Sequence, residues 1–541
     1  MRQTSERIFP GTVQNDGPLI SVLDSRFRGN DNGIRPISLG MLAGMLISLT
    51  WTQVRAAEEL SIRDVARIRP DYAQATIPPN IAPMNFQILE PGTKFKVAFS
   101  GPKGNGFAVS TSDGDIRIPA NKWKPLLEAN AGGELWIDIR AEGPSGRKDF
   151  ARIVNPIAAE PIDPWLAYRF IKPLHNFWKD VAVYQRDLTN FTVSPILRGG
   201  RFENGCVNCH SFANNDPATM TLGIRSQIYD SSTLLVRDGS VNKIASKWGY
   251  TAIHPSGKLA AYSINKVNAF FHNAGLEVRD VVDLDSAILY YDFDKRVVKS
   301  TPDLKDIQRL ETYPAWTPDG KWLYFCSAAI LWTDRATVPP KNFDQVRYDL
   351  RRISYDIEKD QWGKAETVLS SEATGKSILL PRISPDGRLL VFCMCKYGCF
   401  PIYQTTSDLF VMDLQTGQYR PMECNSAFSE SWHSFSSNSR WLAFSSKRQG
   451  GLFTRTYFAY LEPDGKARKP FVLPQEDPDY YEKTLQCFSV PELLTGAVTI
   501  PEKELAAAVV GKDAIQTPLP ITTATPKAGA TPPGKKPVER E

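Results

Sequence analysis

The chain has 541 residues, 42% of them hydrophobic and 11% aromatic, so it is long enough for two or three domains with large cores. Its formal net charge is only +5, from 64 basic and 59 acidic residues. No basic block of the kind that nucleic acid needs is present, so we expect no nucleic-acid partner. The 36 glycines and 40 prolines favour a fold with many turns.

The N-terminus has the layout of a secretory signal peptide, predicted over residues 1–57. An apolar run at residues 37–51 follows Arg35, and the small residues Ala56 and Ala57 provide a cleavage site. The run is short for a membrane span of about 20 residues. An uncleaved N-terminal anchor is the alternative.

Residues 1–33 are polar and fit neither a signal peptide nor an anchor. We therefore expect the true start at Met41 or at a codon near Ile34. Export implies an oxidising compartment, and we expect a periplasmic protein with no integral membrane segment beyond the signal peptide.

A small β-sandwich of the immunoglobulin-like kind is predicted over residues 78–160. Short alternating runs separated by turn signals are typical of such a domain. The runs are 85–89, 94–100, 107–112, 134–140 and 149–154. The segment contains no cysteine, so the domain has no internal disulfide.

Two further segments have no repeated pattern. Residues 161–232 are rich in aromatic side chains and then contain a cysteine motif, so they are predicted to be a linker with a binding segment. Residues 516–541 are rich in Pro, Thr, Ala and Lys and are predicted to be disordered.

Residues 233–500 contain a repeat. Four turn sequences are each followed by a basic residue, a large apolar residue and, three positions further, an aromatic residue. The turns are His254-Pro-Ser-Gly257, Thr317-Pro-Asp-Gly320, Ser384-Pro-Asp-Gly387 and Ser436-Ser-Asn-Ser439. The turns and the alternation predict hairpins, and four antiparallel strands per unit predict the blade of a β-propeller. We expect six blades, with five as the alternative.

The cysteine motif is Cys206-Val207-Asn208-Cys209-His210, a C-x-x-C-H pattern typical of c-type haem attachment. On one turn of a helix the two thiols face the same way, which suits the two vinyl groups of haem. The neighbouring histidine then reaches the iron. We expect one covalent haem c on Cys206 and Cys209, with His210 as the proximal ligand.

The motif has three other interpretations. A zinc site needs a fourth ligand, and the chain has no second C-x-x-C. A thioredoxin-like dithiol needs a βαβ setting, which is absent. A plain disulfide between Cys206 and Cys209 stays open.

The segment around the motif is too short for a free-standing cytochrome domain, so the propeller or the sandwich is expected to cover the haem. The second axial ligand is then expected from those domains. We prefer His272, in a long insertion of the first explicit repeat, and then Met220. His175 is a further local candidate, and His254 is expected to be a structural turn residue.

Propeller topology places several loops at one mouth. His433 opens the innermost strand of its blade and lies at the same mouth as His272. The insertion at 328–346 and the loop from Cys395 to Cys399 are expected there too, and the haem is expected to dock at this mouth.

Nearly the whole mature chain resembles a group of bacterial TolB-like propeller proteins with a single C-x-x-C-H, a group often labelled cytochrome c biosynthesis or TolB-like proteins. The matching segments are 77–85, 184–187, 204–212, 431–446 and 473–478. The resemblance implies a TolB-like propeller and a haem more firmly than a function. The cysteines at 393, 395 and 399 depart from that group.

The remaining cysteines have several interpretations. Cys326 and Cys393 share one repeat slot with serines and are expected to be small buried residues. Cys395 and Cys399 are expected to bridge a hairpin loop, with a second metal site as the alternative. No role is predicted for Cys424 or Cys487.

Three functions follow from these features. The first is periplasmic electron transfer to a protein partner by a monohaem cytochrome. The second is a cell-envelope interaction scaffold in which the haem is structural or sensory, and the third is a haem enzyme with an open axial site. No nucleophile elbow, phosphate loop or motif-placed carboxylate pair occurs, so no catalytic residue is predicted.

Overall fold

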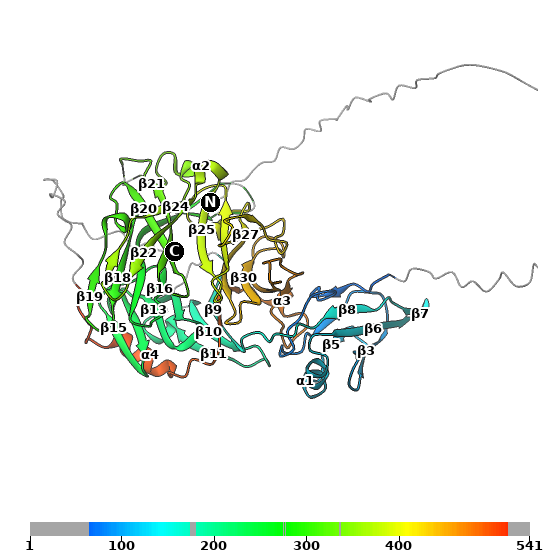
Figure 1. Ribbon diagram of the computed structural model, residues 1–541. Helices are drawn as coiled ribbons and strands as arrows, with labels where there is room; N and C mark the ends of the chain where they lie inside the picture. The colour runs from blue at the N-terminus through cyan, green and yellow to red at the C-terminus, as the bar shows by residue number, and fades with distance from the viewer. Residues whose placement is uncertain are drawn as a thin grey trace, which may run out of the picture. The chain divides into compact units, whose positions relative to one another are not determined.

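The computed structural model describes residues 64–517 except 174–179, 274, 276, 278, 335 and 336. The predicted signal peptide, His175 and nearly all of the predicted disordered tail therefore lie outside the described residues. The described chain is all-β with a few short helices (Figure 1). No helix in this part of the chain has the length and apolar character to cross a membrane.

The N-terminal part consists of two sheets and a helix. The smaller sheet contains β1 (Ile68–Arg69), β2 (Phe86–Ile88) and β5 (Asp115–Ile116). The larger contains β3 (Lys94–Ser100), β4 (Phe107–Thr111), β6 (Glu134–Gly143), β7 (Gly146–Asp149) and β8 (Ile153–Pro156). The ring centroids of Phe86 and Phe99 are 6.5 Å apart across the two sheets, and Trp123 of α1 (Ala120–Ala129) lies 6.2 Å from Phe99. The helix was not predicted.

Four-stranded antiparallel sheets follow one another from residue 165 onward. The first sheet contains β9 (Trp165–Ile171), β10 (Ala182–Asp187), β11 (Val193–Arg198) and β33 (Cys487–Leu494). The second contains β12 (Cys206–Ala213), β13 (Asp216–Arg225), β14 (Ser232–Arg237) and β15 (Ser240–Ile244).

The next two units form one nine-stranded sheet, joined only by the pair Ser286 and Leu310. One unit contains β16 (Thr251–Ile253), β17 (Leu259–Phe271), β18 (Arg279–Asp292) and β19 (Val297–Lys299). The other contains β20 (Arg309–Trp316), β21 (Trp322–Ala329), β22 (Asp349–Asp356), β23 (Gln361–Trp362) and β24 (Glu366–Leu369).

Two more sheets complete the series. One contains β25 (Ser377–Ile383), β26 (Leu389–Cys395), β27 (Asp408–Asp413) and β28 (Tyr419–Pro421). The other contains β29 (Glu430–Phe435), β30 (Trp441–Ser446), β31 (Arg455–Tyr460) and β32 (Phe471–Val472). The remaining helices are α2 (Ser371–Thr374), α3 (Tyr480–Lys483) and α4 (Glu502–Val510).

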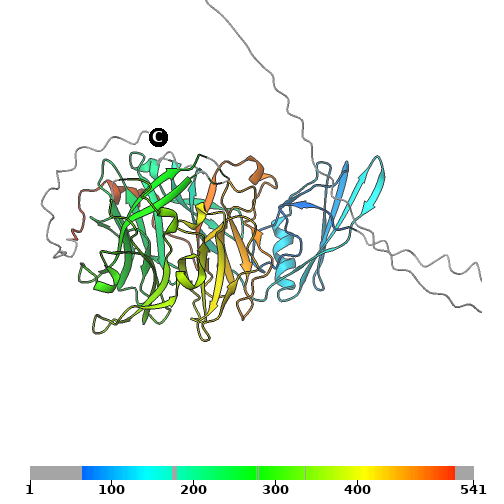
Figure 2. The same ribbon diagram turned by 90° about the horizontal axis from the view of Figure 1, so that it is seen from above.

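The sheets are arranged like the blades of a propeller. The strands β12, β16, β20, β25, β29 and β33 each contact the next one in this series, and β10 contacts β12. The sheets follow one another in chain order in both views (Figures 1 and 2). The last strand, β33, pairs with β9 of the first sheet, so the two ends of the repeated region share one sheet.

The predicted turns occur where the repeat placed them. The amide of each turn's fourth residue donates to the carbonyl of its first, at 2.8 Å for Gly257 and Gly387 and 2.9 Å for Gly320 and Ser439. The backbone φ of these residues lies between 62° and 74°, which favours glycine and makes Ser439 a strained exception.

The predicted segment 161–232 is not a separate linker. Its strands β9 to β13 belong to the series of sheets, and the predicted boundary at residue 233 falls inside β14. The physical reason is that these two sheets have no Pro-Asp-Gly turn and that β12 is rich in Cys, Asn, His and Ser. Without that turn and without alternating apolar residues, the sequence gives no local signal for these two sheets.

Candidate functional site

The C-x-x-C-H motif lies on strand β12, not on the helix that we expected. A bulge interrupts the pairing of β12 with β13, so that Cys206 lies opposite Arg225 and Cys209 opposite Gly223. Positions two apart on a strand face the same way, and both cysteines therefore lie on one face of this ladder. The bulge at Asn208 does what a helical turn was expected to do.

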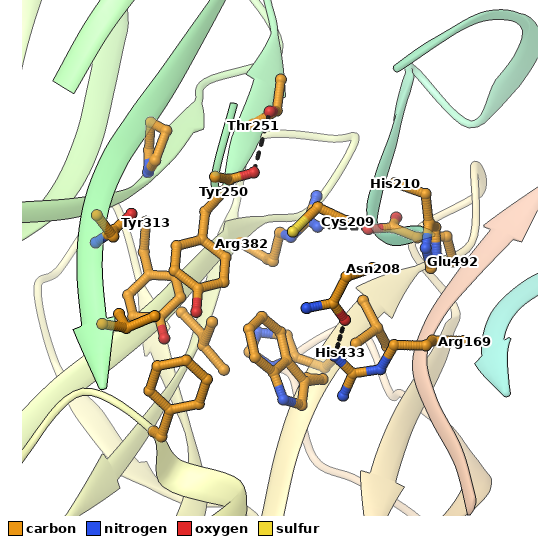
Figure 3. Close-up of a pocket in the computed structure, with 18 of the residues that line it drawn as sticks. Arg169, Asn208, Cys209, His210, Tyr250, Thr251, Tyr313, Arg382, His433 and Glu492 are labelled. Atoms are coloured by element: carbon orange, nitrogen blue, oxygen red, sulfur yellow. Dashed lines mark hydrogen bonds and ion pairs between the residues drawn. The ribbon is translucent and has the colours of Figure 1, made fainter. Parts of the chain in front are cut away.

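The motif opens into a cavity at the inner strands. The cavity and its opening to solvent hold about 980 Å³ of space free of protein atoms. Its lining comes from all of the propeller-like sheets and includes Cys209 and His210. Figure 3 shows the sulfur of Cys209 between Asn208 and Tyr250, and His210 beside Glu492.

Strained bulges surround the cavity. Register shifts occur in β12, β20, β25, β29 and β33 at the residues that line it. Four bulge residues have positive φ without being glycine: Tyr313, Leu380, Trp432 and Val490. Such a conformation costs on the order of 1 kcal/mol or more per residue, and this kind of strain clusters at functional sites.

Two buried histidines line the cavity. Neither ring nitrogen of His210 makes a hydrogen bond within the described residues, and Nδ1 of His433 has no partner either, while its Nε2 lies 3.0 Å from the carbonyl oxygen of Val391. Burial lowers the pKa of each imidazole to about 3, helped by the charges of Arg169 and Arg382 at His210 and of Arg382 at His433. Both rings are therefore neutral at neutral pH, which is the form that coordinates a metal.

Cys209 and His210 provide donors of the kind that a c-type haem needs, whereas Cys206 does not line the cavity. Cys209 lines the cavity, and His210 offers ring nitrogens that lack a protein partner although burial without one is costly. Cys206 lies on the same face but is fully buried among Ile171, Val181 and Cys487. Burial raises the pKa of its thiol to about 11.

Positive charge dominates the cavity wall. Arg169, Arg225, Lys247 and Arg382 line it, against the single carboxylate of Glu492. Arg382 forms an ion pair with buried Glu492, and these two residues also line a second cavity on the side of the hairpin turns. The ion pair therefore lies in the partition between the two cavities.

Aromatic side chains form another part of the cavity wall. The ring centroids of Tyr250 and Tyr313 are 4.1 Å apart, and Trp432 lies 5.5 Å from Tyr250 and 5.9 Å from Tyr313. The hydroxyl of Tyr313 donates to the carbonyl oxygen of Cys399 at 2.5 Å. Phe400 completes the wall at 6.3 Å from Tyr250.

The structure places the predicted second ligands elsewhere. Met220 is fully buried opposite Phe212 in an apolar core and does not line the cavity. His272 also does not line it, and its Nε2 lies 3.3 Å from a carboxylate oxygen of Asp280. His254 is held by Ser256 and the carbonyl of Gly320, as expected for a turn residue.

The predicted gathering of loops is confirmed in part. The rings of His272 and Phe343 are 6.4 Å apart, and Phe343 lies 5.8 Å from Tyr397 of the cysteine loop. His433 faces the cavity instead.

All eight cysteines lie in the described part of the chain, and none forms a disulfide there. Cys395 Sγ lies 3.2 Å from the carbonyl oxygen of Tyr397, so the expected bridge to Cys399 is not made. Cys326 and Cys393 are fully buried, as expected. Within the described residues no group of three His, Cys, Asp or Glu side chains is placed to hold a metal ion.

Sequence reasoning missed most of the cavity wall. One signal was available. Pro314, Pro381 and His433 occupy equivalent positions in their repeats, and the residue before each is large and is the strained bulge residue. Arg225 is the last residue of β13 and Lys247 follows β15, and neither has a repeated counterpart, so no signal for them existed.

Comparisons with known proteins give no family. No family model and no curated protein matches the chain. A crystal structure of an ACO/RPE65 chimera is 13% identical and covers 76% of this chain and 97% of its own, with a TM-score of 0.34. The oligogalacturonate lyase of Vibrio parahaemolyticus is 9% identical (56% and 92% covered, TM-score 0.29), and dipeptidyl peptidase 4 of Porphyromonas gingivalis is 11% identical (56% and 45% covered, TM-score 0.29). Likenesses this weak carry no argument about function.

Proposed function

We propose that the chain is an exported monohaem c-type cytochrome built on a six-bladed TolB-like propeller. Cys206 and Cys209 hold the haem, and His210 is its proximal ligand. The observation that carries this proposal is the buried, neutral imidazole of His210, which lines the same cavity as Cys209 and whose ring nitrogens make no geometrically sound hydrogen bond to the described residues. The pairing of β33 with β9 supports a closed propeller, and the series of contacts between inner strands supports six blades.

We propose periplasmic electron transfer with a protein partner as the activity. A bound haem supplies one-electron chemistry, and the protein sets its potential and its access to solvent. Inner strands of all the propeller-like sheets line the cavity. The aromatic wall limits the water that enters it. The cationic wall stabilises negative charge in it. An envelope scaffold and a haem enzyme with an open axial site are the alternatives.

The test is expression of the exported form with a c-haem maturation system. We expect a covalent haem spectrum in the wild type and its loss in Cys206→Ala together with Cys209→Ala, because no thioether bond can then form. The matched control is Cys326→Ala, a buried cysteine away from the cavity, which is expected to keep the haem. A wild type that never acquires covalent haem would overturn the proposal.

We propose His433 as the second axial ligand, since it is the other histidine of the cavity. Replacing His433 with glutamine is expected to convert a low-spin spectrum into a high-spin one that binds carbon monoxide. His272→Gln is the control and is expected to change nothing. If His433→Gln leaves the spectrum unchanged, His433 is not the ligand, and a wild type that is already high-spin favours the enzyme alternative.

A further inference from the structure

Three cations of the cavity wall have no acidic partner within the described residues: Arg169, Arg225 and Lys247. Arg169 is held by neutral acceptors, Asn208 Oδ1 and, at 3.1 Å, Ser489 Oγ. These contacts fix the direction of the guanidinium without compensating its charge.

The cations lie close to one another and to the cysteines. Burial lowers the pKa of Lys247, and the charge of Arg225 lowers it further. The three cations all act on the thiol of Cys206, and Lys247 also responds to Cys209. Like charges gathered in a partly buried wall repel each other unless an anion binds between them.

We propose that Arg169, Arg225 and Lys247 form an anion-binding corner of the cavity, which takes a ligand with carboxylate groups beside Cys209. Guanidinium groups bind carboxylates with two parallel hydrogen bonds, and the ammonium of Lys247 adds a third donor. Glu492 does not oppose such a ligand, because Arg382 already compensates its charge.

Two sources can supply the carboxylates. One is the pair of propionates of the haem, and in that case the inference rests on the proposed function. The other is a small free carboxylate that enters the cavity, which requires no haem. The Tyr250 and Trp432 rings would flank the apolar part of either ligand.

The experiment compares full-length protein made with and without haem maturation, using oxalate as the probe and uncharged oxamide as its isostere. Calorimetry on the haem-free wild type is expected to show oxalate binding and no oxamide binding. The Arg225→Gln and Lys247→Met double variant is expected to bind oxalate at least about tenfold more weakly, because charge-assisted hydrogen bonds are lost. Each single variant is measured too, with circular dichroism to verify folding, and exposed Lys122→Gln is the control.

The haem-loaded protein separates the two sources. Loss of oxalate binding on loading assigns the corner to the propionates, and the double variant then shifts the reduction potential. Retained binding assigns it to a free carboxylate. Two results together overturn the proposal. The first is that the haem-free wild type and the double variant bind oxalate equally well or do not bind it at all. The second is that, in haem-loaded protein, the double variant has the same reduction potential as the wild type. Failure of haem attachment alone leaves the haem-free titration as an independent test.

Discussion

Replacing Arg382 with methionine is expected to lower the free energy of unfolding by about 3 kcal/mol at pH 8, because Glu492 then stays buried without its cation. Burial already raises the pKa of Glu492, and only Arg382 opposes that shift. Without the arginine the pKa rises further, so the folded state binds a proton that the unfolded state releases. The loss is therefore expected to be smaller at pH 5 than at pH 8, because a lower pH favours the protonated, uncharged form of Glu492. Urea unfolding of the haem-free protein at both pH values measures it.

The second partner provides the internal control. Adding Glu492→Gln to Arg382→Met removes the uncompensated charge and is expected to recover much of the lost stability. Arg152→Met breaks a pair with Asp138 in which both side chains are exposed, and it is expected to cost less than about 1 kcal/mol. An Arg382→Met protein as stable as the wild type at both pH values would show that the pair does not hold the partition together.

Replacing Asp283 with asparagine is expected to raise the stability above pH 7 by up to about 4 kcal/mol. Asp283 is buried and accepts a hydrogen bond from Asn265 Nδ2 at 2.6 Å through one oxygen, while the other oxygen makes no geometrically sound hydrogen bond to the described residues. Burial raises the pKa of this carboxyl from 3.8 to about 7. The folded state therefore binds the extra proton between pH 4 and 7, and the stability that it provides at low pH is lost as the pH rises through that window.

Chemical unfolding from pH 4 to 9 tests this. The Asp283→Asn protein is expected to lose less stability across the window than the wild type, since its amide does not titrate. Asp238→Asn is the control, because Asp238 is exposed at a turn and asparagine tolerates its positive φ. Parallel curves for the wild type and Asp283→Asn would mean that Asp283 is ionised at little cost. Because Asn265 lines the cavity, the variant also tests whether charge at Asp283 affects the site.

The repeated hairpins were predictable because their turns have a strong local chemistry. Gly257, Gly320 and Gly387 adopt the positive φ that their turns require, and the strands follow from alternation. The sheet of β12 was not predictable in this way. Polar residues of β12 face a cavity, so this strand lacks the apolar residues that usually mark a buried strand. The bulge at Asn208 also depends on pairing with β13, which is distant information for a local pattern.

The residues of the candidate site also fall into a predictable and an unpredictable group. The motif and the slot of His433 could be found by spacing along the chain. The wall around them could not, because Arg169 of β9, Glu492 of β33 and Lys247 between β15 and β16 are far apart in the chain. They meet only through the pairing and packing of distant strands, and no local pattern encodes that.

The pairing of β33 with β9 has a consequence for the order of events after synthesis. β33 follows every other strand of the chain, so the sheet that it shares with β9 is completed last. Cys487 of β33 helps to bury Cys206, whose thiol is held in its protonated, unreactive form in the finished fold. Any chemistry at Cys206 must therefore be completed before β33 pairs with β9. The finished fold then protects the product from reversal.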